Sequence, residues 1–157
     1  MSIKMGDKLV VDTNVFVESF FGPEENASCH LLTNLEELNI RLLFSQDTVG
    51  ELFYILKRTC NELGLELEDA QDVLFAATQL FQQGKSINTN YHKHKIDKLL
   101  INDENDQMFV DTAFAGNATH LVTFDMKSGI LGLKKVPFFP CTPHQYLQIR
   151  YSPEPSS

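Results

Sequence analysis

Two short apolar runs in the chain each end on an aspartate. The run Leu9–Val11 is followed by Asp12, and the run His120–Phe124 is followed by Asp125. Both runs have the length and composition of a buried β-strand. Ligands in open α/β sheets bind just outside the carboxyl ends of the strands. We therefore expect the two carboxylates to lie along one edge of a sheet, in a position to act on a ligand.

The rest of the chain alternates strand candidates with amphipathic helices. Further strands are expected at Ile40–Phe44, Ser86–Thr89 and Lys135–Phe139, and helices at Val15–Phe20, Glu24–Leu38, Ser45–Leu63, Glu66–Gln83, Gln107–Ala115 and Pro143–Ile149. Glycines that follow these helical patterns, such as Gly64 and Gly116, are typical helix stops. This alternation predicts an α/β fold with a central parallel sheet of about five strands flanked by helices in three layers.

Composition limits the class of protein. With 157 residues, of which 43% are hydrophobic, the chain is long enough for one domain with its own core. Its net charge of −8 argues against a general nucleic-acid coat protein and leaves room for an acidic site offset by a bound cation. The three cysteines are far apart, which argues against a zinc site or a disulfide framework and favours a reducing cytoplasm. No apolar run has the length of a signal peptide or a membrane span.

A third carboxylate precedes the helix at 107–115. Asp106 closes an acidic cluster that also contains Asp103 and Glu104. In the first helical turn, Asp106 would share a face with Phe109 and Ala113. An unpaired charge is costly on an apolar face, so we expect a cation to meet Asp106 there.

Acidic side chains gathered at one edge repel one another unless a cation joins them. A set of oxygen ligands favours a hard ion, Mg²⁺ or Mn²⁺, held by a few carboxylates and several waters. Such an ion can activate water and stabilise an in-line displacement at phosphorus. Metal-dependent phosphodiester hydrolysis is the reaction that fits this pattern best.

Two of the acidic residues also have a plain structural interpretation. Asp12 alone can be the N-cap of the helix that follows it. Glu51 lies opposite the apolar stripe of its helix by periodicity, where it would be a solvated residue paired with Lys57 or Arg58.

A basic segment interrupts the acidic chain between the helix at 66–83 and the acidic cluster. It contains His92, Lys93, His94 and Lys95. The His-x-His pair lacks a third metal ligand at matching spacing. The segment is either a solvated loop or a loop that faces phosphate beside the acidic edge.

Several motifs together resemble the PIN domain family over roughly residues 8–147. They are Val-Val-Asp12-Thr-Asn14-Val-Phe, Ser45-Gln-Asp-Thr-Val-Gly-Glu51-Leu, Asp103-Glu-Asn-Asp106-Gln-Met-Phe-Val-Asp-Thr-Ala and Leu-Val-Thr123-Phe-Asp125. The closing Pro140-Cys-Thr-Pro-His-Gln-Tyr-Leu147 is similar to the end of the toxin members of toxin–antitoxin pairs. The resemblance implies a PIN-like domain over residues 1–150, followed by a disordered tail at 151–157.

The resemblance also assigns roles to the acidic residues. Asp12, Asp106 and Asp125 match metal ligands of the family, and Glu51 matches its helix glutamate, which binds a second ion or positions the water. This role requires the helix of Glu51 to be buried on two sides, against the periodicity argument. The polar residues Asn14 and Thr123 match supporting positions, and Asp103 is an additional or substitute candidate for the third acid.

The resemblance implies a Mg²⁺- or Mn²⁺-dependent endoribonuclease, the toxin of a toxin–antitoxin pair, held inactive by an antitoxin protein. Family members are often dimeric, which leaves a homodimer open. His92, Lys93, His94, Lys95 and Lys127 are the candidates for RNA contact. Lys127 departs from the usual pattern of the family, and beside Asp125 it would either hold a phosphate or weaken metal binding.

Two other classes of protein stay open. One is a non-catalytic module of the same fold that binds protein or RNA. The other is a phosphatase with Asp12 as its nucleophile; phosphatases of the haloacid-dehalogenase type have a second aspartate where this chain has Asn14.

Overall fold

The computed structural model describes residues 6–90, 106–124 and 129–152. Its centre is a five-stranded sheet in the order β3-β2-β1-β4-β5, in which all neighbours pair in parallel. The strands are β1 (Asp7–Val11), β2 (Ile40–Phe44), β3 (Lys85–Ser86), β4 (His120–Val122) and β5 (Phe139–Cys141). The predicted α/β fold with a parallel sheet of five strands is confirmed.

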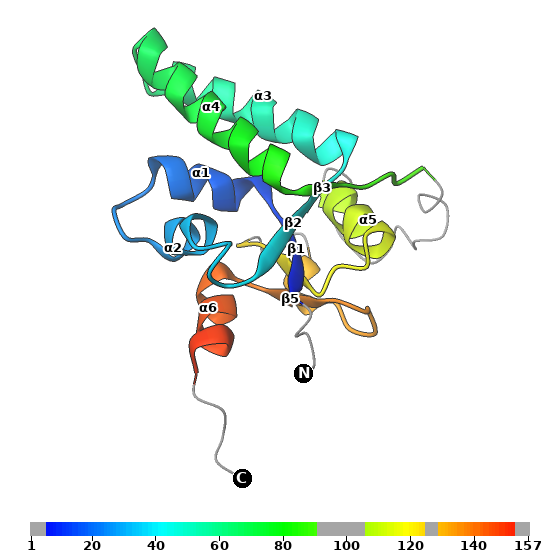
Figure 1. The fold of residues 1–157 in the computed structure, drawn as a ribbon. Coiled ribbons are helices and arrows are strands. Elements are labelled where there is room, and N and C mark those ends of the chain that lie inside the picture. Colours follow the sequence, from blue (N-terminus) through cyan, green and yellow to red (C-terminus); the bar gives the residue numbers. More distant parts are fainter. Residues whose placement is uncertain (1–5, 91–105, 125–128, 153–157) are drawn as a thin grey trace.

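Helices lie between the strands along the chain, and one helix follows the last strand. The helices are α1 (Thr13–Phe21), α2 (Ala27–Thr33), α3 (Gln46–Glu62), α4 (Leu67–Gln83), α5 (Gln107–Ala115) and α6 (Pro143–Tyr151), with a short 3₁₀ helix, η3 (Ile130–Gly132). Figure 1 shows α1, α2 and α6 on one side of the sheet and α5 on the other. None of these helices is long and apolar enough to cross a membrane.

Alternation along the strands divides the core into two halves. Leu9 and Val11 of β1 face one cluster, with side chains of α1, α2, α3, α4 and α6, and Val10 faces the other, with α5 and η3. Successive side chains of a strand point to opposite faces, so a central strand with helices on both sides must be apolar throughout. This is why the strand runs in the sequence are continuous rather than alternating.

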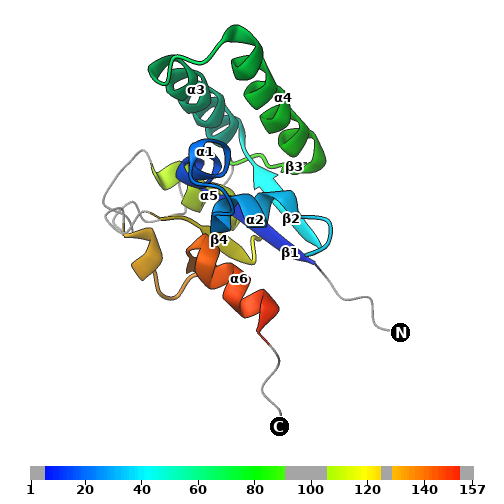
Figure 2. The same cartoon turned by 90° about the vertical axis from the view of Figure 1, so that its left-hand side faces the viewer.

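Helices α3 and α4 form a long hairpin that extends beyond α1 (Figures 1 and 2). The hairpin begins with a capping box, in which the N–H of Ser45 donates to Thr48 Oγ1 at 2.9 Å and the N–H of Thr48 donates to Ser45 Oγ at 3.4 Å. Several of its large apolar side chains are exposed: Tyr54, Leu63, Leu67 and Phe75.

The last strand differs from the sequence prediction. It was expected at Lys135–Phe139 and lies at Phe139–Cys141. Lys135 has a φ of 62°, a left-handed conformation that no strand accommodates. The proline inside the strand, Pro140, is tolerated because β5 is an edge strand. The expected strand at Ser86–Thr89 likewise begins one residue earlier and is shorter, and the helix expected at Glu24–Leu38 is confined to α2.

A polar cluster attaches α6 to the amino end of β1. The hydroxyl of Tyr146 and Nη1 of Arg150 both donate to Asp7 Oδ2, at 2.7 and 2.9 Å, and Nη2 of Arg150 donates to the carbonyl of Leu38. Burial and the bond to Asp7 raise the pKa of Tyr146, which keeps its hydroxyl protonated as a donor. This cluster lies at the end of β1 opposite Asp12.

Candidate active site

Asp12 lies at the carboxyl end of β1 and is almost completely buried, with 3% of its surface exposed. Its Oδ2 accepts a 2.7 Å hydrogen bond from the hydroxyl of Thr123, and its Oδ1 accepts a 3.4 Å bond from the N–H of Asn14. Asp12 is therefore the N-cap of α1, as its plain interpretation predicted. The capping bond uses Oδ1, and Oδ2 accepts the bond from Thr123, which directly follows β4.

The sheet register brings Thr123 to Asp12. Val11 of β1 pairs with Val122 of β4, so the next residue of each strand leaves the sheet at the same level. The N–H of Asp12 donates to the carbonyl of Val122 at 2.9 Å, and the N–H of Thr123 donates to the carbonyl of Cys141 at 2.9 Å. Thr123 is fully buried and fixed by its backbone, so its hydroxyl has a defined direction.

Glu51 approaches this edge from α3. The hydroxyl of Thr13 lies 3.5 Å from Glu51 Oε2, at the limit of a hydrogen bond, and Thr13 directly follows Asp12. Glu51 is half-buried rather than solvated, so the periodicity argument about its position is wrong. Helix α3 also packs on α1, whose Thr13 lies beside Glu51.

Asp106 is the N-cap residue of α5 and is half-buried, and its side chain makes no capping bond. Helix α5 is tied to the same edge, because the hydroxyl of Thr112 donates to Ser45 Oγ at 2.8 Å. The helix also contains Asp111, only 8% exposed, whose Oδ1 accepts a 3.0 Å bond from the amide of Gln107.

Three residues of this edge were not given a role in the site from the sequence: Thr13, Ser45 and Thr112. Each makes its contact to another element of the fold, Thr13 to α3 and Thr112 to Ser45. From the sequence, Ser45 was expected only as the first residue of the helix at Ser45–Leu63. No pattern within one segment indicates such contacts.

The remaining candidates lie outside the described residues. These are Asp125, Asp103, His92, Lys93, His94, Lys95 and Lys127. Asn14 is described, and its side chain is exposed beside the buried Asp12. Across 6–90, 106–124 and 129–152, no three acidic, histidine or cysteine side chains form a group that would hold a metal ion.

The oxygen atoms at this edge have the chemistry that a hard divalent ion requires. The side chains of Asp12 and Glu51 offer carboxylate oxygens. The buried thiol of Cys141, which pairs with Val122 in the sheet, is not a suitable ligand. Burial raises the pKa of Cys141 to about 12, so it stays protonated. Mg²⁺ and Mn²⁺ prefer carboxylates and water to thiols, and the donor set fits them.

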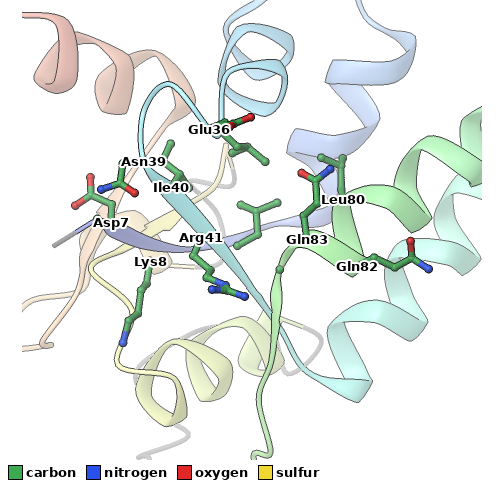
Figure 3. A pocket seen from close by; sticks show the side chains of 13 residues that line it. Asp7, Lys8, Glu36, Asn39, Ile40, Arg41, Leu80, Gln82 and Gln83 are labelled. Carbon is green, nitrogen blue, oxygen red and sulfur yellow. The ribbon is translucent and has the colours of Figure 1, made fainter.

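A cavity of about 680 Å³ lies at the opposite edge of the sheet (Figure 3). It is lined by charged side chains of both signs, among them Asp7, Lys8, Glu36 and Arg41, and by the amides of α4. Because it opens beside the amino ends of β1 and β2, it is separated from Asp12 by the length of the strand. We therefore do not place the reaction there.

Comparison with known proteins agrees with this fold. The family model described as "PIN domain" matches residues 8–127, and the chain belongs to the PIN domain family. No curated protein matches the chain at a significant level.

Two solved structures are similar in fold. VapBC2 from Rickettsia felis, bound to a DNA fragment from its promoter, has a TM-score of 0.57 and 17% identity, over 85% of this chain and 96% of that chain. FitAcB from Neisseria gonorrhoeae has a TM-score of 0.53 and 16% identity, over 87% of this chain and 98% of that chain.

Proposed function

We propose that the protein is a Mg²⁺- or Mn²⁺-dependent endoribonuclease that acts as the toxin of a toxin–antitoxin pair in the cytoplasm. The observation that supports this most is the environment of Asp12. Burial of a carboxylate is costly, and Asp12 is almost fully buried. Thr123 donates a hydrogen bond to Asp12, and the next residue in the chain, Thr13, lies within hydrogen-bond distance of Glu51. Without a cation, this arrangement of carboxylates lowers the stability of the domain. A cation bound there would offset that cost.

In this proposal Asp12 and Glu51 hold the ion together with Asp106 and Asp125. A bound divalent ion would activate water and neutralise charge at the phosphate. The residues of this chain bind and orient: the hydroxyl of Thr123 fixes which oxygen of Asp12 faces the ion, and outer hydrogen bonds of this kind tune metal affinity.

The basic candidates would bind the RNA backbone. His92, Lys93, His94, Lys95 and Lys127 supply cations in a chain with a net charge of −8. Contacts to phosphate add affinity and position the strand without reading its sequence.

Asp103 is the alternative to Asp106 as the third acid.

An antitoxin partner is supported by the neighbours in structure, VapBC2 and FitAcB, which are toxin–antitoxin complexes. The exposed apolar side chains of the α3–α4 hairpin, including Leu67 and Phe75, are consistent with a protein partner. A homodimer is a second association that the proposal allows. Growth arrest on expression of the chain, relieved by co-expression of its antitoxin, is the expected result.

The test of the catalytic proposal compares the wild type with Asp12→Asn and with Asp69→Asn, an exposed residue in the first turn of α4. We expect Mn²⁺-dependent cleavage of single-stranded RNA by the wild type and by Asp69→Asn. Asp12→Asn should lose it by at least about a hundredfold, as expected for a metal ligand. Cleavage that persists in Asp12→Asn, or in excess chelator, would contradict the proposal.

A second candidate function is a non-catalytic module of the same fold that binds protein or RNA. It is favoured by one observation: the α3–α4 hairpin exposes large apolar side chains, such as Leu67 and Phe75, which suit a protein partner. Titration calorimetry with Mn²⁺ separates the two candidates, because a non-catalytic module of this kind gives no saturable heat.

A further inference from the structure

A second cavity, of about 620 Å³, opens at the carboxyl ends of β2 and β3. Its walls come from the first turns of α3, from the end of α4 and from residues 86–90 after β3. In the sheet order β3-β2-β1-β4, this position is next to β1 on the edge that carries Asp12. Strands lie about 4.8 Å apart, so the cavity is roughly 5 to 10 Å from Asp12 across the sheet.

Helix α3 connects the cavity with the acidic edge. Gln46, Asp47 and Gly50 line the cavity, and Glu51 directly follows Gly50. Residues four apart on a helix lie on the same face, so Asp47 and Glu51 are neighbours one turn apart. If one unit of a polymer binds at Glu51, the next unit of the same polymer therefore reaches the cavity.

Apart from the carboxylate of Asp47, the described side chains of the walls are uncharged. Among the residues that the structure describes, the lining includes the amides of Gln46, Asn88 and Asn90 and no lysine or arginine. A phosphate in this cavity would meet the carboxylate of Asp47 without a cation from these described residues. A planar uncharged group with N–H and C=O edges suits the amides better, and a nucleobase is such a group.

The cavity also offers apolar surface and a fixed wall. Phe81 lines it, and aromatic side chains are the usual contact surface for bases of single strands. The wall after β3 is held by the N–H of Ile87, which donates to the carbonyl of Phe44 at 2.7 Å, and by Asn88 Oδ1, which accepts from the N–H of Asn90 at 2.9 Å. A pre-formed wall loses little entropy on binding.

We propose that this cavity is a base-binding subsite, which holds one base of the RNA strand whose phosphodiester bond lies at the acidic edge. The proposal rests on the proposed function, because it takes RNA as the substrate. The subsite gives the enzyme a base preference close to the cleaved bond, read by the amides of Gln46, Asn88 and Asn90.

The test measures binding without cleavage. Four fluorescent homopolymeric RNA oligonucleotides, of adenosine, cytidine, guanosine or uridine, are titrated by anisotropy in excess chelator. We expect the wild type to bind the preferred sequence about tenfold more tightly than the weakest one, which is the scale of one well-made amide–base contact. Asn88→Ala should reduce this ratio to about two.

Gly50→Leu fills the cavity and should have the same effect. An added Cβ at Gly50 has no heavy atom within 4 Å, so the new side chain starts in open space. Gln79→Ala, an exposed position of α4 that does not line the cavity, is the control and should keep the full ratio. Circular dichroism checks that all variants are folded.

The outcomes separate the subsite from the proposed function. Equal or undetectable binding of the four oligonucleotides by the wild type, or an unchanged ratio in both Asn88→Ala and Gly50→Leu, overturns the subsite. If the wild type shows a base preference that these variants lose but never cleaves RNA with Mn²⁺, the subsite stands and the catalytic proposal fails. If the wild type cleaves RNA with Mn²⁺ but binds the four oligonucleotides equally, the catalytic proposal stands and the subsite fails.

Discussion

The hydroxyl of Thr123 donates a 2.7 Å hydrogen bond to Oδ2 of Asp12 and thereby joins the carboxyl ends of β4 and β1. Both residues are buried, so water does not replace the bond if it is lost. The bond fixes the direction of the carboxylate before any cation binds. Its removal should therefore affect the site more than the fold.

Thr123→Val tests this directly, because valine keeps the shape of threonine and removes the hydroxyl. We expect Mn²⁺ affinity and RNA cleavage to fall about tenfold to a hundredfold, the usual effect of losing a bond to a metal ligand. The free energy of unfolding should fall by about 1 to 3 kcal/mol, since one oxygen of Asp12 loses its donor. Calorimetry, initial cleavage rates and urea unfolding measure the three quantities.

Two variants control this experiment. Thr123→Ser restores the hydroxyl and should recover most of the affinity. Thr78→Val removes a hydroxyl that donates to the carbonyl of Leu74 within α4, away from the site, and should leave metal binding unchanged. If Thr78→Val lowers Mn²⁺ affinity as much as Thr123→Val does, the effect is not specific to Asp12.

Asp106→Asn tests the third acid. Asparagine is as good an N-cap as aspartate, and the side chain of Asp106 makes no capping bond, so α5 should stay intact. We expect saturable Mn²⁺ binding by the wild type to be lost or weakened at least tenfold in this variant. Titration calorimetry is the measurement, with Asp69→Asn of α4 as the exposed control. Equal binding by wild type and Asp106→Asn would move the third position to another acid, with Asp103 the first to examine.

Local sequence patterns predicted the elements whose ends have clear signals. Helix α5 ends before Gly116 as expected, and β2 has the predicted bounds. The last strand was misplaced because Val136 and Phe138 look like strand residues, whereas the left-handed φ of Lys135 sets the chain on another path. Proline is rare inside strands, so Pro140 also argued against a strand at Phe139–Cys141.

The site was predictable only in part, for a related reason. The positions of Asp12 and Thr123 follow from strand ends and the parallel register. The approach of Glu51 to Thr13 depends on how α3 crosses α1, which periodicity does not encode. The resemblance to a family corrected the position of Glu51, where a single helical stripe had placed it in solvent.

The polar cluster at the other end of β1 should stabilise the fold without serving the site. Arg150→Met removes the donors to Asp7 and to the carbonyl of Leu38. We expect the free energy of unfolding to fall by about 1 to 3 kcal/mol, because partly buried acceptors lose a charged donor. Arg58→Met, which breaks an exposed pair with Glu62, should cost less than about 1 kcal/mol. Urea unfolding compares the two, and a smaller loss in Arg150→Met than in Arg58→Met would contradict this role.

His120 should make stability depend on pH. Burial lowers its pKa below the ordinary value of 6.5; the charge of Asp7 opposes this shift and that of Arg150 adds to it. Below pH 6.5 the unfolded chain therefore takes up a proton that the folded protein binds less readily. The contribution of His120 to stability is fully present above that pH and is lost as the pH falls toward its lowered pKa in the folded state.

The expected result is a free energy of unfolding that declines between about pH 7 and pH 5, with a smaller decline in His120→Asn. Asparagine also removes the ring that packs edge-on against Tyr146 at 5.0 Å, so the slope against pH is the quantity to compare, not the absolute stability. His144→Asn, at an exposed position of α6, is the matched control. Urea unfolding in chelator at several pH values excludes any contribution from metal binding. A slope in His120→Asn equal to that of the wild type would show that other groups produce the decline.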